Sequence, residues 1–155
     1  MEQNNLISFA NVKASLFDPE VLTLLAPSVY NPTPERLKHR AEEYAADSNV
    51  KAYACKNSEK YIGIVVFVTE NGTTEILDIA VKPEYRKHGI GRKLIDFIFN
   101  RFPVDTIIAE TDDEAVGFYK RYGFAVTPTK EVSDIRRYFC KLSAVSKHYD
   151  MLIEE

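Results

Sequence analysis

The feature that most constrains this chain is the glycine pair in Gly89-Ile90-Gly91, which stands between a strand and a helix. Residues 74–81 (TEILDIAV) predict a buried strand, and Lys82-Pro83 ends it because proline cannot donate to a ladder. An amphipathic helix is predicted over about 89–102, where Pro103 stops it. Glycine lowers helix stability. Two glycines at a helix start therefore indicate a backbone that something else approaches closely.

Basic side chains crowd around these glycines. Five Lys or Arg residues fall within Lys82–Lys93, and they repel one another unless an anion lies among them. A helix N-terminus offers unpaired N–H groups and the positive end of the helix dipole. The strand, loop and helix together therefore predict a pyrophosphate site. Because the net charge is −3, the basic cluster is local, and neither nucleic acid nor an anionic membrane is expected as a partner.

Two common phosphate-binding motifs do not explain the loop. The P-loop pattern GxxxxGK[ST] is absent, and the dinucleotide pattern GxGxxG fails because Leu94 stands at the third glycine position. The loop also follows a hairpin strand in the middle of the chain rather than the first strand of a βαβ unit. A helix start with solvated charges and no ligand is the alternative interpretation.

Length and composition predict a single domain over residues 1–155, with a core of ordinary size. No apolar run approaches the ~20 residues that span a bilayer, and no signal peptide is apparent. We therefore expect a cytoplasmic protein without membrane association. Cys55, Cys140 and the three histidines show no metal-ligand spacing, so reduced thiols and no metal are expected.

The order of predicted elements is strand, two helices, three strands, helix, strand, helix and two strands. It indicates an α/β (α+β layered) domain with a mixed central sheet of about six to seven strands and helices on both faces. Asn71-Gly72 is a strong hairpin turn signal. The predicted ranges are strand 4–10, helices 18–25 and 33–46, strands 52–55, 61–69 and 74–81, helix 89–102, strand 105–110, a helix from Asp112 or Asp113 to Tyr122, and strands 124–126 and 137–141.

Local signals mark the ends of two of these helices. Thr33 is expected to cap the helix over 33–46, with Pro34 at its first position. Either Asp112 or Asp113 is expected to cap the helix that reaches Tyr122, and Gly123 suits the left-handed position after it. In the helix over 33–46, one face is predicted to be apolar, with Leu37, Ala41 and Tyr44.

Two motifs resemble those of a known family. Residues 86–91 (RKHGIG) match R/Q-x-x-G-x-G/A, and residues 115–124 (AVGFYKRYGF) are similar to A-[IV]-x-F-Y-x-x-x-G-F. In this order they resemble the GCN5-related N-acetyltransferase (GNAT) family, closely over about residues 63–124. One departure is Asp112, where many members carry Asn. The resemblance implies the GNAT fold and an N-acetyltransferase that uses acetyl-CoA.

Two alternatives to this activity stay open. One is a non-catalytic acyl-CoA-binding sensor or interaction module with the same fold, although the retained Tyr119 argues against it. The other is a nucleotide- or phosphate-binding protein of another fold, which lacks the motifs expected for it.

The resemblance also implies which residues hold the cofactor. The backbone at the end of the strand would pair with the pantetheine arm, and N–H groups from Lys87 to Arg92 would take the pyrophosphate. His88 is expected to add charge or to face solvent rather than to act as a base. The implied cofactor-binding residues are Ile79, Ala80, Val81, Arg86, Lys87, His88, Gly89, Ile90, Gly91 and Arg92.

Acyl transfer needs a base for the amine and a proton for the departing thiolate. Tyr119 matches the family tyrosine that commonly donates to the thiolate. Its alternative role is that of a tyrosine on an amphipathic helix that packs on the sheet.

Glu75 falls where histone-acetylating members keep a catalytic glutamate. Side chains alternate along a strand, so Glu75 is expected on one face of residues 74–81, and Asp78 on the other with Ile76 and Ala80. Asp78 is the rival base, an acid within an apolar strand and nearer its end. A structural hydrogen bond to a neighbouring loop is its alternative role. A chain of waters is a third option, because some members use one.

The acceptor is expected to be a small-molecule amine or a peptide amine. The family builds the acceptor site from segments that correspond to Leu22–Arg40 and Val126–Cys140, in which Tyr30, Glu35 and Asp134 are candidates to face an amine. No additional peptide-binding domain is apparent, which slightly favours a small molecule. Homodimers are common in the family, but the sequence does not decide the oligomeric state.

Overall fold

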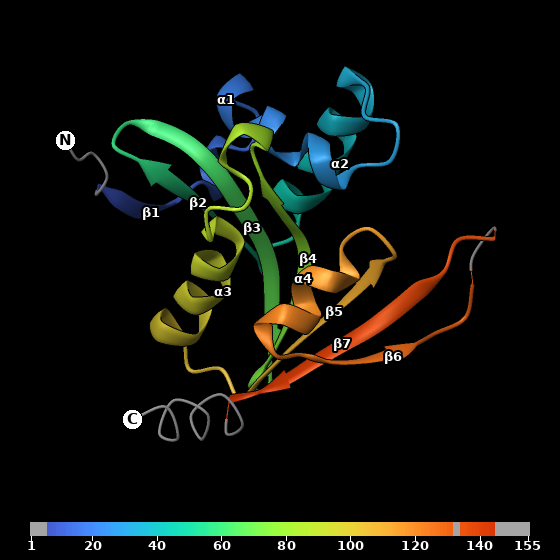
Figure 1. The fold of residues 1–155 in the computed structure, drawn as a ribbon. Coiled ribbons are helices and arrows are strands. Elements are labelled where there is room, and N and C mark those ends of the chain that lie inside the picture. Colours follow the sequence, from blue (N-terminus) through green and yellow to red (C-terminus); the bar gives the residue numbers. More distant parts are fainter. Residues whose placement is uncertain (1–5, 132–133, 145–155) are drawn as a thin grey trace. The chain divides into compact units, whose positions relative to one another are not determined.

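The computed structural model describes residues 6–131 and 134–144, which form a mixed sheet and four α-helices (Figure 1). Seven strands are hydrogen-bonded in the order β1-β2-β3-β4-β5-β7-β6. β4 and β5 are parallel, whereas β1 with β2, β2 with β3, and β7 with its two neighbours are antiparallel. The elements are β1 (Ile7–Asn11), α1 (Pro19–Leu22), α2 (Pro34–Ala46), β2 (Val50–Asn57), β3 (Lys60–Glu70), β4 (Thr73–Val81), α3 (Ile90–Arg101), β5 (Thr106–Asp112), α4 (Val116–Tyr122), β6 (Ala125–Pro128) and β7 (Arg137–Ser143), with 3-10 turns η1 (Lys13–Ser15), η2 (Thr23–Ser28) and η3 (Pro83–Tyr85).

The chain divides into two compact units. The first comprises Met1–Val68 and Leu77–Ile98, and the second comprises Thr69–Ile76 and Phe99–Glu155. β4 contributes to both units, because the boundary falls between Ile76 and Leu77. The expectation of one domain over residues 1–155 remains a prediction.

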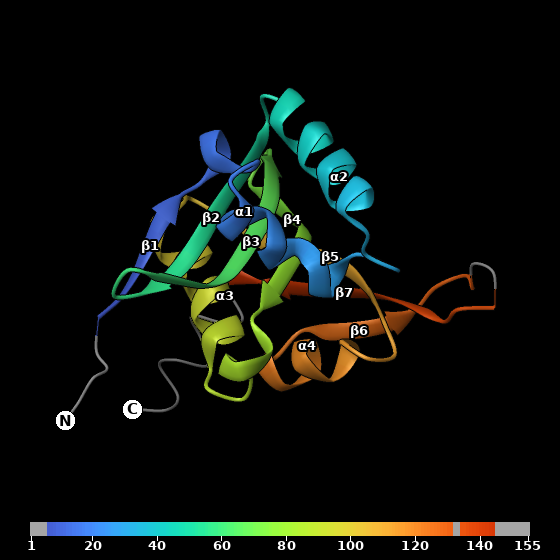
Figure 2. The same cartoon turned by 90° about the horizontal axis from the view of Figure 1, so that it is seen from above.

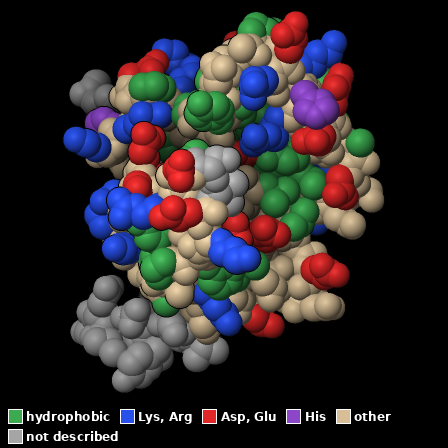
Figure 3. Space-filling view, turned by 90° about the vertical axis from the view of Figure 1, so that its right-hand side faces the viewer, with side chains coloured by type: hydrophobic (Ala, Val, Ile, Leu, Met, Phe, Trp, Pro, Cys, Tyr) green, Lys and Arg blue, Asp and Glu red, His purple; other side chains and the backbone are tan. Residues whose placement is uncertain are grey.

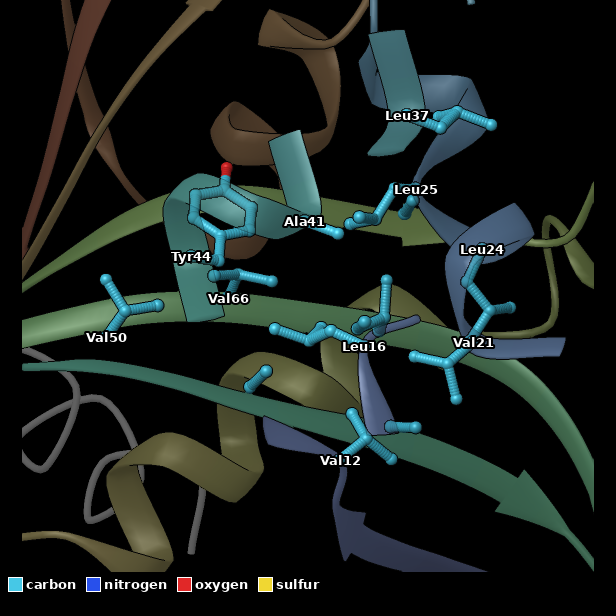
Figure 4. Packing of buried hydrophobic residues seen from close by; sticks show 14 of the residues in the cluster. Val12, Leu16, Val21, Leu24, Leu25, Leu37, Ala41, Tyr44, Val50 and Val66 are labelled. Carbon is cyan, nitrogen blue, oxygen red and sulfur yellow. The ribbon is translucent and has the colours of Figure 1, made fainter. Parts of the chain in front are cut away.

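In the first unit, helices cover both faces of β2 and β3 (Figure 2). One face packs against α1, η2 and α2 through a cluster of buried apolar side chains (Figure 4). The other face meets α3. The ring centroid of Phe97 on this helix lies 4.5 Å from that of Phe9 and 5.0 Å from that of Tyr53. The predicted helices on both faces of the sheet are therefore confirmed in this unit.

The sequence specifies α2 through its first turn and its apolar side. Thr33 caps the helix, with its hydroxyl accepting the Arg36 N–H at 3.1 Å, and Pro34 occupies the first helical position. The three residues predicted for the apolar face, Leu37, Ala41 and Tyr44, are all buried.

In the second unit, β5 and β6 flank β7, and α4 packs through its aromatic residues. The ring centroids of Tyr119 and Tyr122 lie 5.1 Å and 5.7 Å from the ring centroid of Phe124. Gly123 ends α4 with a φ of 122°, and its N–H donates to the carbonyls of Tyr119 and Lys120. A positive φ at this position is readily adopted by glycine, as the sequence predicts.

Three sequence expectations need correction. The helix expected over residues 18–25 is α-helical only over Pro19–Leu22 and continues as η2, because Pro27 has no N–H to donate to the carbonyl four residues earlier. Neither Asp112 nor Asp113 caps α4. Its N-cap is Ala115, and the Asp112 carboxylate instead accepts the N–H groups of Glu114 and Ala115 in the preceding turn. The first strand spans Ile7–Asn11, and residues 4 and 5 lie outside the described part of the chain.

The Asn71-Gly72 turn provides a stability test. Gly72 has a φ of 82°, and a Cβ there would lie 2.5 Å from an Asp105 carboxylate oxygen. We expect Gly72→Ala to lower the free energy of unfolding by about 1–2 kcal/mol, since a left-handed backbone strains alanine. Gly117→Ala is the matched control. This residue lies inside α4 and meets only the flexible tip of Arg121, so stability should hold or rise. Urea denaturation measures both, and equal effects would contradict the assignment.

Candidate active site

The site begins where β4 turns into α3 in the first unit. The Lys82 N–H donates to the carbonyl of Ile62 on β3 at 2.9 Å, and η3 follows at once. The Arg86 side chain returns to the strand, with its Nε donating to the Val81 carbonyl at 3.3 Å. These two bonds tie the loop to the end of the strand, so that the loop leads directly into the start of α3.

The loop presents backbone N–H groups at the start of α3. Gly89 has a φ of 78° with open space where a Cβ would project, and its carbonyl accepts the Lys93 N–H at 3.0 Å. The N–H groups of Ile90 and Gly91 precede that first helical bond and have no partner inside the helix. Arg86, Lys87 and His88 are exposed beside them. This arrangement of N–H groups, dipole and cations suits a phosphate-bearing ligand.

Gly63 is a residue that sequence reasoning missed. A Cβ at this β3 position would lie 3.1 Å from the Ala80 carbonyl oxygen and 3.2 Å from a side-chain carbon of Ile90. The absence of a side chain therefore lets the start of α3 and the end of β4 pack closely on β3. A glycine within the β-branched run of residues 61–69 was the available signal, because it often marks a close backbone approach.

The alternation predicted for β4 is confirmed. Thr74, Ile76, Asp78 and Ala80 are buried, whereas Glu75 is exposed. The parallel ladder joins Thr73–Ile76 to Thr106–Ala109. β4 continues beyond the last pair of that ladder as Leu77–Val81, and this segment contains the residues expected to pair with pantetheine.

Asp78 carries the most densely bonded carboxylate of this region. Arg40 Nη1 donates to Oδ1 at 3.1 Å and to Oδ2 at 2.8 Å, and the Tyr44 hydroxyl also donates to Oδ2. The Asp78 side chain is 4% exposed and that of Arg40 is 31% exposed. The structural hydrogen bond considered for Asp78 therefore exists, although its partners lie on α2 rather than in a loop.

Sequence reasoning missed Arg40 and assigned Tyr44 only to the apolar face of α2. The usable signal was that a buried carboxylate needs a cation or donors nearby. Arg40 and Tyr44 stand four residues apart, so both lie on one side of the helix. In Figure 4 the Tyr44 hydroxyl points away from Val50 and Val66, while the ring joins the apolar cluster.

The network shifts the titration of both α2 residues. Burial and the Asp78 carboxylate raise the pKa of Tyr44 well above its usual value near 10, so Tyr44 remains a hydrogen-bond donor. Burial lowers the pKa of Arg40, but the Asp78 carboxylate and its hydrogen bond outweigh that effect and raise the pKa overall. The guanidinium therefore stays charged and continues to compensate the buried carboxylate.

The other two catalytic candidates lie in the second unit. Tyr119 is on α4 and is 3% exposed, with its ring 5.2 Å from Phe118 and in edge contact with Phe124. Glu75 lies on the first part of β4, opposite Ile108 of β5. The structure thus gathers Asp78, the strand end and the basic loop in one unit, and Tyr119 and Glu75 in the other.

The acceptor candidates are exposed. Tyr30 is 82% exposed in the segment between η2 and α2, and Glu35 lies in the first turn of α2. Asp134 belongs to the second unit and has a φ of 64°. No contact in the structure assigns any of the three to an amine.

An open groove of ≈ 840 Å³ adjoins the basic loop within the first unit. Both apolar and charged side chains line it. Its lining residues are Ile7, Asn57, Ile62, Glu84, Tyr85, His88, Ile90 and Lys93.

Residues 6–131 and 134–144 contain neither a metal-ligand cluster nor a membrane-spanning helix. No group of three or more His, Cys, Asp or Glu side chains there is arranged to hold a metal ion. Among the helices of this part of the chain, none combines the length and apolar character needed to cross a bilayer. On the face drawn in Figure 3, acidic and basic side chains are intermixed.

Comparison with known sequences identifies related proteins. The profile of the acetyltransferase (GNAT) domain family matches residues 48–126. The peptidyl-lysine N-acetyltransferase YjaB of Salmonella typhimurium is 29% identical over 93 residues, which cover 59% of this chain and 61% of that protein. YjaB of Escherichia coli (strain K12) is 39% identical over 56 residues, which cover 36% of this chain and 38% of that protein. The matches thus span less than two thirds of either curated relative.

Comparison with solved structures supports the fold. A crystal structure of a GNAT family acetyltransferase from Elizabethkingia anophelis with acetyl-CoA bound has a TM-score of 0.64 against this chain. Sequence identity is 22%, and the alignment covers 90% of this chain and 99% of that one. The predicted fold class is therefore confirmed.

The raised pKa of Tyr44 predicts a pH effect on stability. Above about pH 10 the unfolded chain loses the tyrosine proton while the folded protein keeps it, so this contribution to stability is present below pH 10 and falls as pH rises. We expect Tyr44→Phe to reduce the loss of stability at alkaline pH by up to about 1 kcal/mol per pH unit. Urea denaturation of both proteins from about pH 8 to about pH 11 measures this. Parallel curves would contradict it.

Proposed function

Because the chain belongs to the acetyltransferase (GNAT) domain family, we propose that it transfers the acetyl group of acetyl-CoA to a primary amine. The observation that carries this proposal is the strand, glycine loop and helix start of the first unit. Gly89 adopts a positive φ with open space around it, beside N–H groups and exposed cations. This backbone suits a pyrophosphate and is hard to explain as a plain helix start.

The loop and strand residues bind the co-substrate in this proposal. N–H groups from Lys87 to Arg92 hold the pyrophosphate, and the charges of Arg86, Lys87 and His88 offset its negative charge. The backbone of Ile79–Val81 pairs with the pantetheine arm. The assignment of residues to the pyrophosphate and to the pantetheine arm rests on the family resemblance. The fit of the loop to a phosphate-bearing ligand rests on its geometry.

The reaction proceeds by direct attack in a ternary complex. The deprotonated amine adds to the thioester carbonyl, and a backbone N–H near the end of β4 stabilises the oxyanion that develops. The nitrogen of the adduct then loses its extra proton to the base or to solvent, the carbon–sulfur bond breaks, and the thiolate takes a proton from the Tyr119 hydroxyl. The products are the acetylated amine and coenzyme A. Tyr119 regains its proton through solvent or the base.

We assign the base to Glu75 rather than to Asp78. Both oxygens of Asp78 already accept hydrogen bonds from Arg40 and Tyr44, whereas the Glu75 side chain is exposed and open to water. Asp78 and a chain of waters stay as the alternatives. No metal takes part in this scheme.

The acceptor class is an amine, and a lysine side chain of a peptide is our first choice. The two relatives described above, YjaB of Salmonella typhimurium and of Escherichia coli, carry the name peptidyl-lysine N-acetyltransferase. This shifts the preference from the small-molecule amine that the sequence slightly favoured. A cytoplasmic location and a homodimer stay as expectations.

The activity is tested with the purified chain. Calorimetry with acetyl-CoA and coenzyme A measures binding, and release of free thiol is followed with a lysine-containing peptide, a polyamine, an aminoglycoside and an amino-acid derivative. Binding with amine-dependent thiol release supports a transferase. Binding without release from any amine supports the non-catalytic acyl-CoA sensor. Absence of binding overturns the proposal.

Tyr119→Phe tests the acid. We expect kcat to fall about 100-fold with little change in the KM for acetyl-CoA, because the thiolate loses its proton donor while the ring contacts remain. Tyr122→Phe is the matched control. This residue is another buried tyrosine of α4 in contact with Phe124, and its loss should leave kcat near the wild-type value. Full turnover by Tyr119→Phe would remove Tyr119 from the mechanism.

Glu75→Gln tests the base. If Glu75 accepts the amine proton, kcat should fall at least tenfold near neutral pH and recover partly at alkaline pH, where more amine is already deprotonated. The pH profile of kcat for both proteins measures this. An unchanged profile would assign the proton to water or to another carboxylate.

A further inference from the structure

A partly buried network of three side chains, Arg40, Tyr44 and Asp78, joins α2 to β4 beside the proposed cofactor strand. We propose that Arg40 and Tyr44 are positioning residues for acetyl transfer, which act through Asp78 to hold the end of β4, Ile79–Val81, in place for the pantetheine arm. This inference rests on the proposed function. Nothing in the two family motifs includes either residue.

The geometry makes the network an anchor rather than a single contact. Asp78 receives two hydrogen bonds from Arg40 Nη1, at 2.8 Å and 3.1 Å, and one from the Tyr44 hydroxyl. Donors that approach both carboxylate oxygens restrict rotation of the side chain as well as its position. Because Asp78 immediately precedes Ile79, a fixed Asp78 side chain restrains the backbone of the next residues.

The placement along β4 explains why an anchor is useful there. The parallel ladder of the second unit covers Thr73–Ile76, and Leu77–Val81 follows its last pair. A strand end that must offer its backbone groups to a ligand cannot use all of them in a sheet. A side-chain anchor restrains the strand and leaves those backbone groups available.

Stability alone does not explain the network. Burying a carboxylate is costly, and well-packed apolar residues commonly give equal or greater stability than a buried ion pair. The neighbouring buried positions of β4 are Ile76 and Ala80, so an apolar residue would suit position 78. A buried charge at this position is therefore better explained by the geometry it imposes on β4.

α2 is held firmly enough to act as the support. Its Leu37 and Ala41 are buried in the same cluster as the Tyr44 ring, and Thr33 caps its first turn. Arg40 and Tyr44 therefore extend from a packed helix. Motion of Asp78 relative to that helix would break three hydrogen bonds together.

The test uses Tyr44→Phe, Arg40→Ala and Arg40→Lys in the full chain. Tyr44→Phe removes one oxygen and keeps the ring in the apolar cluster, so we expect it to fold even if Arg40→Ala does not. Glu43→Gln is the matched control, because Glu43 lies on the same helix in an exposed pair with His39 at 3.4 Å. For each protein we measure kcat, the KM for acetyl-CoA, the KM for the amine and the Kd for coenzyme A. Urea denaturation gives the free energy of unfolding, and from it the folded fraction in the assay.

We expect the KM for acetyl-CoA and the Kd for coenzyme A to rise about tenfold in Tyr44→Phe and Arg40→Ala, as for loss of a hydrogen bond to a charged group. The KM for the amine should stay within about twofold. Arg40→Lys keeps the charge and should fall between wild type and Arg40→Ala. Glu43→Gln should match the wild type.

A purely structural network gives a different result. It would lower kcat in proportion to the folded fraction and leave the KM for acetyl-CoA and the Kd unchanged, and that outcome overturns the inference. Failure of the wild-type chain to bind coenzyme A is a separate result, because it overturns the proposed function itself.

Discussion

The close packing of α3 on β3 at Gly63 is the constraint on which the candidate site depends. A Cβ at position 63 would lie 3.1 Å from the Ala80 carbonyl oxygen and 3.2 Å from a side-chain carbon of Ile90. Because glycine has no Cβ, both residues can pack closely on β3. The loop between β4 and α3, which includes η3, then reaches the start of α3 through two residues with positive φ angles, Lys87 and Gly89. The first N–H groups of α3 follow directly after the exposed cations of this loop.

The first unit also buries a carboxylate, that of Asp78, within an otherwise apolar part of β4. Asp78 faces the apolar cluster that α1, η2 and α2 share with the sheet. Its charge is acceptable there only because α2 delivers a guanidinium and a phenol to the same point. Tyr44 satisfies both demands at once, since its ring completes the core while its hydroxyl reaches the carboxylate.

These two features account for different parts of the proposed chemistry. In our proposal, the glycine loop supplies affinity for a phosphate-bearing co-substrate, and the Asp78 network fixes the geometry of the neighbouring strand end. Tyr119 and Glu75 belong to the second unit and carry the proton transfers in our scheme. Loss of the Tyr119 hydroxyl should therefore lower kcat, because it removes stabilisation of the transition state. Loss of the hydrogen bonds to Asp78 should instead raise the KM for acetyl-CoA, because it weakens ground-state binding.

The sequence by itself determined the order of the elements, the Asn71-Gly72 hairpin, the alternation along β4 and the glycine loop, because each depends on residues adjacent in the chain. The caps were predicted less well. Thr33 caps α2 as expected, but Asp112 bonds in a turn before α4 rather than capping it. Only the tertiary structure decided what surrounds Asp78 and Gly63. Arg40 and Asp78 are 38 residues apart in the chain, and no local pattern specifies which helix meets a buried carboxylate. The packing of α2 on the sheet brings Arg40 and Tyr44 to the Asp78 carboxylate, and our proposal of a positioning role rests on these hydrogen bonds.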